Sequence, residues 1–153
     1  MSQVVFVGDV DGRAIRDGKD LYAAASEDIQ PGLLCVVTAG SSVALADADD
    51  APWGVAYGAR HQVYRPTSKT FADGEELVLL KGDFVAYYSA AFFVGETLPS
   101  QDDTLYSASS GSMDSSGSNK VGKCTRLFTR TEEIGGVGTS QNLAEVLFEI
   151  GKP

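Results

Sequence analysis

The chain has 153 residues and a mass of 16.1 kDa, which fits one domain that can bury a core without disulfides or metals. Its net charge of −9, with lysines and arginines scattered along the sequence, argues against a nucleic-acid-binding surface. No apolar stretch approaches the ~18 residues of a membrane-spanning helix, and no basic region precedes the short apolar run near the N-terminus. We therefore expect a protein made in a cytoplasm that contacts neither nucleic acid nor membrane directly.

The chain is expected to begin with an extended N-terminal arm, residues 1–19, followed by a β-rich domain, residues 20–153. Two turn dipeptides, Asp11-Gly12 and Asp17-Gly18, separate the apolar start of the arm from the rest. The arm is either a frayed terminus or a strand that docks on a neighbouring subunit by strand addition. In the second interpretation its anchor residues are Val4, Val5, Phe6 and Val7.

The segment from Leu21 to Ile29 fits two structures. Leu21, Ala25 and Ile29 lie at positions i, i+4 and i+8, as on one stripe of a helix, and they alternate equally well in an extended strand. Pro31-Gly32 ends the segment in either case.

From Gly32 onward, short apolar runs separated by turn residues predict β-strands. The 17 glycines favour turns over helices, so the expected fold class is all-β, as a single β-barrel or β-sandwich-like body. In the last strand Ala144, Val146, Phe148 and Ile150 share one face, which predicts a half-buried strand. The expected strands are Leu33–Thr38, Ser42–Ala46, Pro52–Tyr57, His61–Tyr64, Leu77–Leu80, Phe84–Tyr88, Lys120–Phe128 and Leu143–Ile150.

The centre of the fold is expected to be a β-hairpin. It joins the runs Leu77–Leu80 and Phe84–Tyr88 through the tripeptide Lys81-Gly82-Asp83, where glycine can supply the positive φ of a tight turn. A helix over the same stretch would hold Gly82 and several β-branched and aromatic residues in its interior, where all of them are unfavourable.

Three connections are expected to be polar surface loops. Asp47–Asp50 is an acidic turn, and Gly135–Gly138 is a flexible loop before the last strand. Residues 107–120 are half serine, too polar for a core, and predict a mobile surface loop.

The sequence contains little that predicts catalysis. It has neither a phosphate-binding loop of the Gly-x-x-x-x-Gly-Lys-Ser/Thr type nor a Gly-x-Ser-x-Gly elbow. A lone histidine, His61, and two distant cysteines do not make a usual zinc site, and Asp47–Asp50 lacks the spacing of a calcium loop. We expect no enzyme, no cofactor and no metal. Cys35 and Cys124 are expected to be buried free thiols, although their sequence positions leave a disulfide open.

The aromatic residues are the more informative feature. They are expected to pack the core, or to form an apolar patch for subunit contact in which Trp53 and Tyr57 take part. Basic residues do not alternate with them, so they do not predict a stacking surface for single-stranded nucleic acid.

Several phrases occur in an order that points to one family. They are Asp28-Ile29-Gln30-Pro31-Gly32-Leu33-Leu34, Pro52-Trp53-Gly54-Val55-Ala56, Gly82-Asp83-Phe84-Val85, Val94-Gly95-Glu96-Thr97-Leu98, Leu105-Tyr106 and Val121-Gly122-Lys123. In this order they resemble the capsid cement, or head decoration, proteins of tailed bacteriophages over about residues 20–150. The first resembles that family's I-x-x-G-x-hydrophobic entry into its strands, and the second is similar to its P-x-G-V-A step. Residues 98–103 and 107–120 look longer than is usual in the family.

The resemblance implies a non-catalytic β-barrel or sandwich-like body on the outer surface of a bacteriophage head. It implies the major capsid protein as partner, often bound by a homotrimer at local three-fold positions, and hence a location on the virion. The expected function is a capsid cement protein that stabilises the shell. The alternative is a virion-surface binding module for carbohydrate or host adhesion that uses Trp53 and tyrosines. The third hypothesis, an enzyme, requires a pocket in which His61 meets acidic residues.

Overall fold

The computed structural model describes residues 4–8, 21–25, 27–38, 42–58, 71–74, 76–134 and 137–150. Strands dominate this part of the chain, so the all-β prediction is confirmed. The strands are β1 (Val4–Gly8), β2 (Leu21–Ala25), β3 (Leu34–Thr38), β4 (Ser42–Leu45), β5 (Gly54–Gly58), β6 (Glu76–Leu80), β7 (Gly82–Tyr88), β8 (Thr104–Ser107), β9 (Met113–Asp114), β10 (Lys120–Ile134) and β11 (Val137–Ile150). Short 3₁₀ turns form η2 (Ala90–Phe92), η3 (Val94–Glu96) and η4 (Ser109–Gly111).

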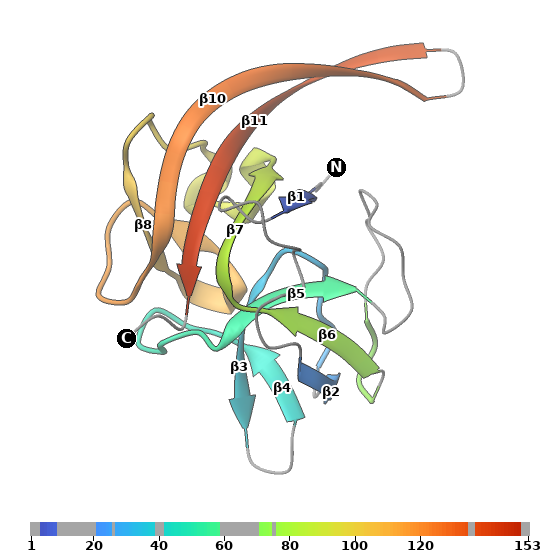
Figure 1. Ribbon diagram of the computed structural model, residues 1–153, viewed down its shortest axis with the longest axis vertical. Helices are drawn as coiled ribbons and strands as arrows, with labels where there is room; N and C mark the ends of the chain where they lie inside the picture. The colour runs from blue at the N-terminus through green and yellow to red at the C-terminus, as the bar shows by residue number, and fades with distance from the viewer. Residues whose placement is uncertain are drawn as a thin grey trace.

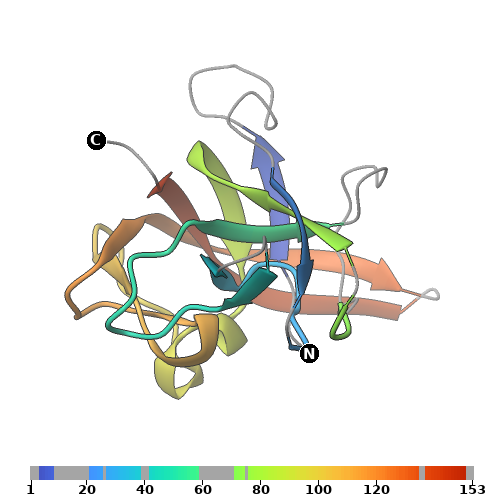
Figure 2. The same ribbon diagram turned by 90° about the horizontal axis from the view of Figure 1, so that it is seen from below.

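The strands form two sheets that lie against each other (Figures 1 and 2). The first is an open antiparallel sheet of six strands in the order β1-β7-β11-β10-β8-β9. In the second, the pairing order β2-β4-β3-β5-β6 returns to β2, which gives a small five-stranded barrel with one parallel pair, β2 with β4. The body as a whole is therefore neither one barrel nor a simple sandwich.

The predicted central hairpin is wrong, although both of its strands exist. β6 pairs with β2 and β5 in the barrel, whereas β7 pairs with β1 and β11 in the six-stranded sheet. Gly82 has φ +99°, so the glycine supplies the expected positive φ. It turns the chain from one sheet into the other, and each strand pairs with two strands of its own sheet in place of the hairpin partner.

One hydrophobic cluster fills the space between the sheets. Tyr88 is its centre: the ring meets Phe92 edge-on at 5.0 Å and Phe148 at 5.7 Å, and the hydroxyl donates to the carbonyl of Gly32 at 2.8 Å. The barrel contributes Leu34, Val55 and Leu80 to the same cluster. A second cluster, inside the barrel, consists of Ile29, Cys35, Val43, Ala56, Phe71, Leu77 and Leu79.

The strand predictions are confirmed for most segments. Leu21–Ala25 is a strand, which decides between the two structures that its sequence allowed, and Ile29 makes an isolated bridge with Phe71. The buried face of the last strand is also confirmed, since Ala144, Val146, Phe148 and Ile150 are all buried. The predicted strand His61–Tyr64 lies outside the described residues.

The serine-rich segment, residues 107–120, is only in part the surface loop that its composition predicts, since residues 115–118 are exposed and irregular whereas the rest is structured. It contains β9 and η4, and both Ser107 and Met113 are 1% exposed. Its polar groups bond to the acidic turn and to the residue before it: Ser107 Oγ donates to the carbonyl of Asp47 at 2.9 Å, and the amide of Gly111 donates to the carbonyl of Ala46 at 2.7 Å. Serine and glycine are used here because they satisfy backbone groups of another loop at close range.

Candidate binding surfaces

The four anchor residues predicted in the N-terminal arm lie in β1. This strand pairs antiparallel with β7 of its own chain, Val4 opposite Tyr88 and Phe6 opposite Ala86, and it forms one edge of the six-stranded sheet. No described strand pairs with the backbone edge of β1 that faces away from β7, which is the arrangement of a strand-addition site. The structure thus shows a strand paired within the chain's own sheet, which is neither the frayed terminus nor the strand docked on a neighbouring subunit that the sequence allowed.

Trp53 and Tyr57, the other predicted contact residues, belong to the barrel. Trp53 precedes β5, is half-buried, and packs against the cluster inside the barrel. Lys81 Nζ lies 4.6 Å from the centroid of its ring. Tyr57 is within β5, but its side chain lies outside the described residues. Because β1 and β5 belong to different sheets, the predicted contact residues do not share one sheet face.

The two cysteines are free and buried, as predicted. Burial raises the pKa of Cys35 to about 12, and burial together with the nearby carboxylate of Asp103 raises the pKa of Cys124 to about 11. Thiols with such pKa values carry almost no thiolate at neutral pH and are poor nucleophiles. His61, the other residue considered for catalysis, lies outside the described residues.

The described residues contain no group of three or more histidine, cysteine, aspartate or glutamate side chains placed to hold a metal ion. In the same part of the chain, none of the helices has the length and hydropathy of a transmembrane span.

A long two-stranded ribbon is the most prominent feature outside the body (Figure 1). β10 and β11 pair in continuous register from Arg126–Glu145 to Ile134–Val137. The pairing of β7 to β11 begins only at Ala144, and that of β8 to β10 ends at Lys123. In the described part of the chain, no third strand therefore pairs with the ribbon, which we define as residues 128–134 and 137–143. At ~3.4 Å per residue the ribbon is roughly 20 Å long.

A bulge and a polar cluster fix the point where the ribbon leaves the body. The register of β10 shifts between Cys124 and Arg126, which leaves Thr125 as the extra residue of a β-bulge, a feature that bends and twists a strand. Glu145, opposite the bulge, accepts from Thr125 Oγ1 at 2.7 Å and from Arg126 Nε at 2.9 Å. The Arg126 guanidinium lies 4.6 Å from the centroid of the Phe128 ring.

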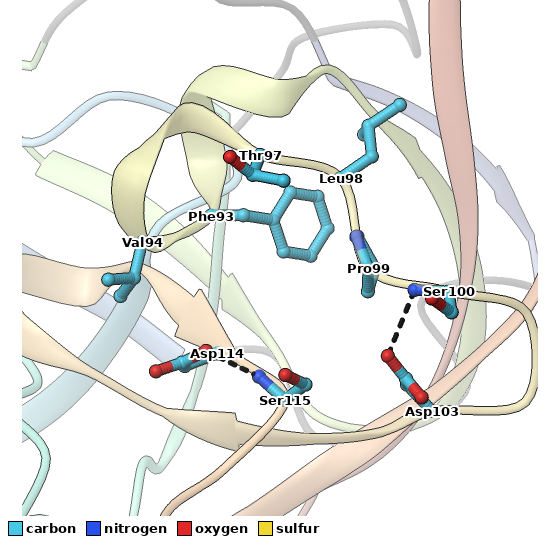
Figure 3. Close-up of a pocket in the computed structure, with 9 residues that line it drawn as sticks. All are labelled: Phe93, Val94, Thr97, Leu98, Pro99, Ser100, Asp103, Asp114 and Ser115. Atoms are coloured by element: carbon cyan, nitrogen blue, oxygen red, sulfur yellow. Dashed lines mark hydrogen bonds between the residues drawn. The ribbon is translucent and has the colours of Figure 1, made fainter.

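A small pocket lies between the segment after η2 and the β8–β9 edge of the six-stranded sheet (Figure 3). Its volume is about 210 Å³. The ring of Phe93 and Pro99 form one side, and Asp103 and Asp114 lie on the other. Val94, at the rim, is 46% exposed.

Sequence reasoning missed both the ribbon and the pocket. The ribbon had a signal: Gly135-Gly136 is a two-residue hairpin dipeptide, and Thr129–Ile134 is rich in β-branched residues. The prediction ended the strands at Phe128 and Leu143 and treated Gly135–Gly138 as a flexible loop, whereas β11 already begins at Val137. No sequence signal predicted the pocket, because it forms between segments that only tertiary folding brings together.

Comparison with protein-family models gave no match to this sequence, and comparison with curated proteins gave none either.

Proposed function

We propose that this chain is a non-enzymatic capsid cement, or decoration, protein that binds the outer surface of a bacteriophage head and stabilises the shell. The resemblance of its ordered phrases to that family suggests the proposal. The observation that carries it is the β10–β11 ribbon, which extends beyond the body with both of its outer backbone edges unpaired by any described strand. A two-stranded ribbon is marginally stable alone in water, so a neighbouring surface would stabilise it.

The sequence of the ribbon suits a pair of exposed strands that binds a partner at its tip. Its strands are polar over Thr129–Glu133 and Gly138–Asn142, which keeps the ribbon compatible with water. At its end Ile134 pairs with Val137, so two apolar residues stand where the ribbon extends furthest from the body. An apolar tip on a polar stem fits insertion between subunits of a neighbouring surface.

The partner in this proposal is the major capsid protein, and the protein acts as a homotrimer at local three-fold positions of the virion. Symmetry matching favours a trimer at a three-fold axis, and three simultaneous contacts add through their effective concentration. A protein that binds assembled shells but not dispersed subunits shifts the equilibrium towards the shell by mass action.

The test is the location of the protein on purified phage particles. Cryo-electron microscopy should show its density outside the shell, with the ribbon bridging two capsid subunits. Particles that lack the protein should lose their DNA at a lower temperature than complete particles. Density within the tail, or particles free of the protein, would refute the proposal.

The alternative function, a carbohydrate-binding module, is less well supported. Sugar rings stack on open aromatic faces, whereas Trp53 packs against the barrel cluster and has Lys81 Nζ 4.6 Å from its ring centroid. A glycan array separates the two functions, since selective binding that Trp53→Ala abolishes would favour the carbohydrate module.

A further inference from the structure

We propose that the pocket beside β8 and β9 receives an arginine side chain from a protein partner. This inference identifies a contact of the proposed function and rests on it only for the identity of the partner, a capsid subunit. The pocket lies at the β9 edge of the six-stranded sheet, whereas β1 forms the opposite edge.

The size of the pocket favours a single side chain. Its volume of about 210 Å³ is below the roughly 300–1,000 Å³ of sites that enclose small-molecule ligands. Its walls also differ in character: Phe93 and Pro99 are apolar, whereas Asp103 and Asp114 are acidic (Figure 3). A ligand that fits both walls needs an apolar stem and a cationic end, which is the structure of a long basic side chain.

The two carboxylates are held in place by backbone amides, and the second oxygen of each accepts no hydrogen bond from a described residue. Asp103 Oδ2 accepts from the amide of Ser100 at 2.9 Å, and Asp114 Oδ1 accepts from the amide of Ser115 at 2.7 Å. The ion pairs among the described residues are Lys123–Asp102 and Arg126–Glu145, so neither pocket carboxylate has a described cation. Carboxylates fixed in advance bind with a smaller loss of side-chain freedom.

Arginine fits this arrangement better than lysine or a metal ion. The planar guanidinium offers five donors in a fixed fork to the carboxylates, whereas an ammonium is a compact point charge. Two carboxylates are too few protein ligands for a calcium site, which takes 6–8 oxygens. The net charge of −9 also attracts basic partner surfaces over long range.

The inference is tested on the isolated chain by ¹H–¹⁵N NMR titration with the tripeptide acetyl-Gly-Arg-Gly-amide. We expect saturable shifts at the amides of Ser100 and Ser115 in the millimolar range, because exposed ion pairs are weak. The neutral isostere with citrulline in place of arginine should leave these amides unchanged, and the lysine peptide should bind more weakly.

The test variant carries both Asp103→Asn and Asp114→Asn. The matched control carries Asp102→Asn alone. Asparagine retains an acceptor for the amides of Ser100 and Ser115, and spectra of the free proteins report whether the fold is kept. The double variant should weaken the affinity for the arginine peptide about fivefold or more. Asp102→Asn removes a charge beside the pocket and should change this affinity less than twofold.

Equal shifts with the citrulline peptide, equal or tighter binding of lysine, or unchanged affinity in the double variant would each overturn the inference. So would a site that responds to calcium chloride but not to the arginine peptide. Because the titration uses no particles, its outcome is separate from that of the proposed function: absence of the protein from virions leaves the peptide result standing.

Discussion

The two halves of the β10–β11 hairpin are continuous in backbone pairing but opposite in environment. In the half near the body, β11 pairs with β7 and its alternate residues Val146 and Phe148 are fully buried. In the ribbon, no described third strand joins the pair, and the sequence is polar up to its tip. The transition begins at Leu127, which is 44% exposed although its partner Ala144 is buried. One hairpin thus contributes to the buried body at one end and extends from it as a polar two-stranded ribbon at the other.

Loss of a core ring in the body half should have the largest effect on stability. Phe148 is fully buried and stacks on Phe84 at 4.8 Å. We expect Phe148→Ala to lower the free energy of unfolding by about 3–5 kcal/mol, measured by urea denaturation. Phe128→Ala, on the half-buried outer side of the same hairpin, is the matched control and should cost clearly less. Equal losses would contradict the division of the hairpin.

Loss of the hydrogen bond that joins the two sheets should have the second-largest effect on stability. Tyr88→Phe keeps the ring but leaves the buried carbonyl of Gly32 without the hydroxyl that donates to it at 2.8 Å. We expect a loss of about 1–3 kcal/mol in the free energy of unfolding. Tyr106→Phe, at a half-buried position in β8, is the control and should stay within about 0.5 kcal/mol of wild type.

Alkaline pH should destabilise the body through its thiols. The pKa of Cys35 is raised from 9.0 to about 12 in the folded state, so the unfolded chain releases this proton first. The stabilisation is complete below pH 9 and is lost as the pH rises towards 12. Between pH 9 and 10 we expect a fall of about 1 kcal/mol in the free energy of unfolding. Cys35→Ala should flatten this dependence, and an unchanged slope would refute the assignment to Cys35.

The polar cluster at the base of the ribbon should contribute little to stability. Glu145→Gln weakens the 2.9 Å pair with Arg126, whose side chain is 52% exposed. We expect only a small loss in the free energy of unfolding, because water screens exposed pairs. Asp102→Asn, which removes the more exposed 3.6 Å pair with Lys123, should cost still less. A loss above about 2 kcal/mol for Glu145→Gln would show that the bulge region stabilises the whole body.

Removal of the ribbon should have the smallest effect on stability and, under the proposed function, abolish attachment. The variant replaces residues 130–141 with Asn-Gly, which suits a tight turn between Thr129 and Asn142. Its free energy of unfolding should stay within about 0.5 kcal/mol of wild type. Co-sedimentation with particles that lack the protein should lose at least about tenfold in affinity. Ile134→Thr with Val137→Thr tests the tip alone, and full binding by both variants would exclude the ribbon as the attachment element.

The sequence located most of the individual strands, because alternation and turn residues act locally. The face formed by Ala144, Val146, Phe148 and Ile150 is an example, since alternation on a pleated strand needs no knowledge of the partner. The serine content of residues 107–120 predicted a surface loop, but some of these polar residues make tertiary contacts. Ser107 is buried because its hydroxyl bonds to the acidic turn. The ribbon strands were not predicted because most of their residues are polar. A strand without a buried face shows no alternation of apolar and polar residues.

The all-β class, the positions of most turns and strands, and the apolar surroundings of the two thiols follow from local sequence patterns. Tertiary structure alone decided the partners of those strands, because pairing depends on the summed burial of segments far apart in the chain. Gly82 shows the division: its positive φ follows from the residue type, whereas the passage from β6 in the barrel to β7 in the open sheet follows from the partners each strand finds. The pocket between Phe93 and Asp114 arises in the same way, from a sheet edge and a loop that only folding brings together.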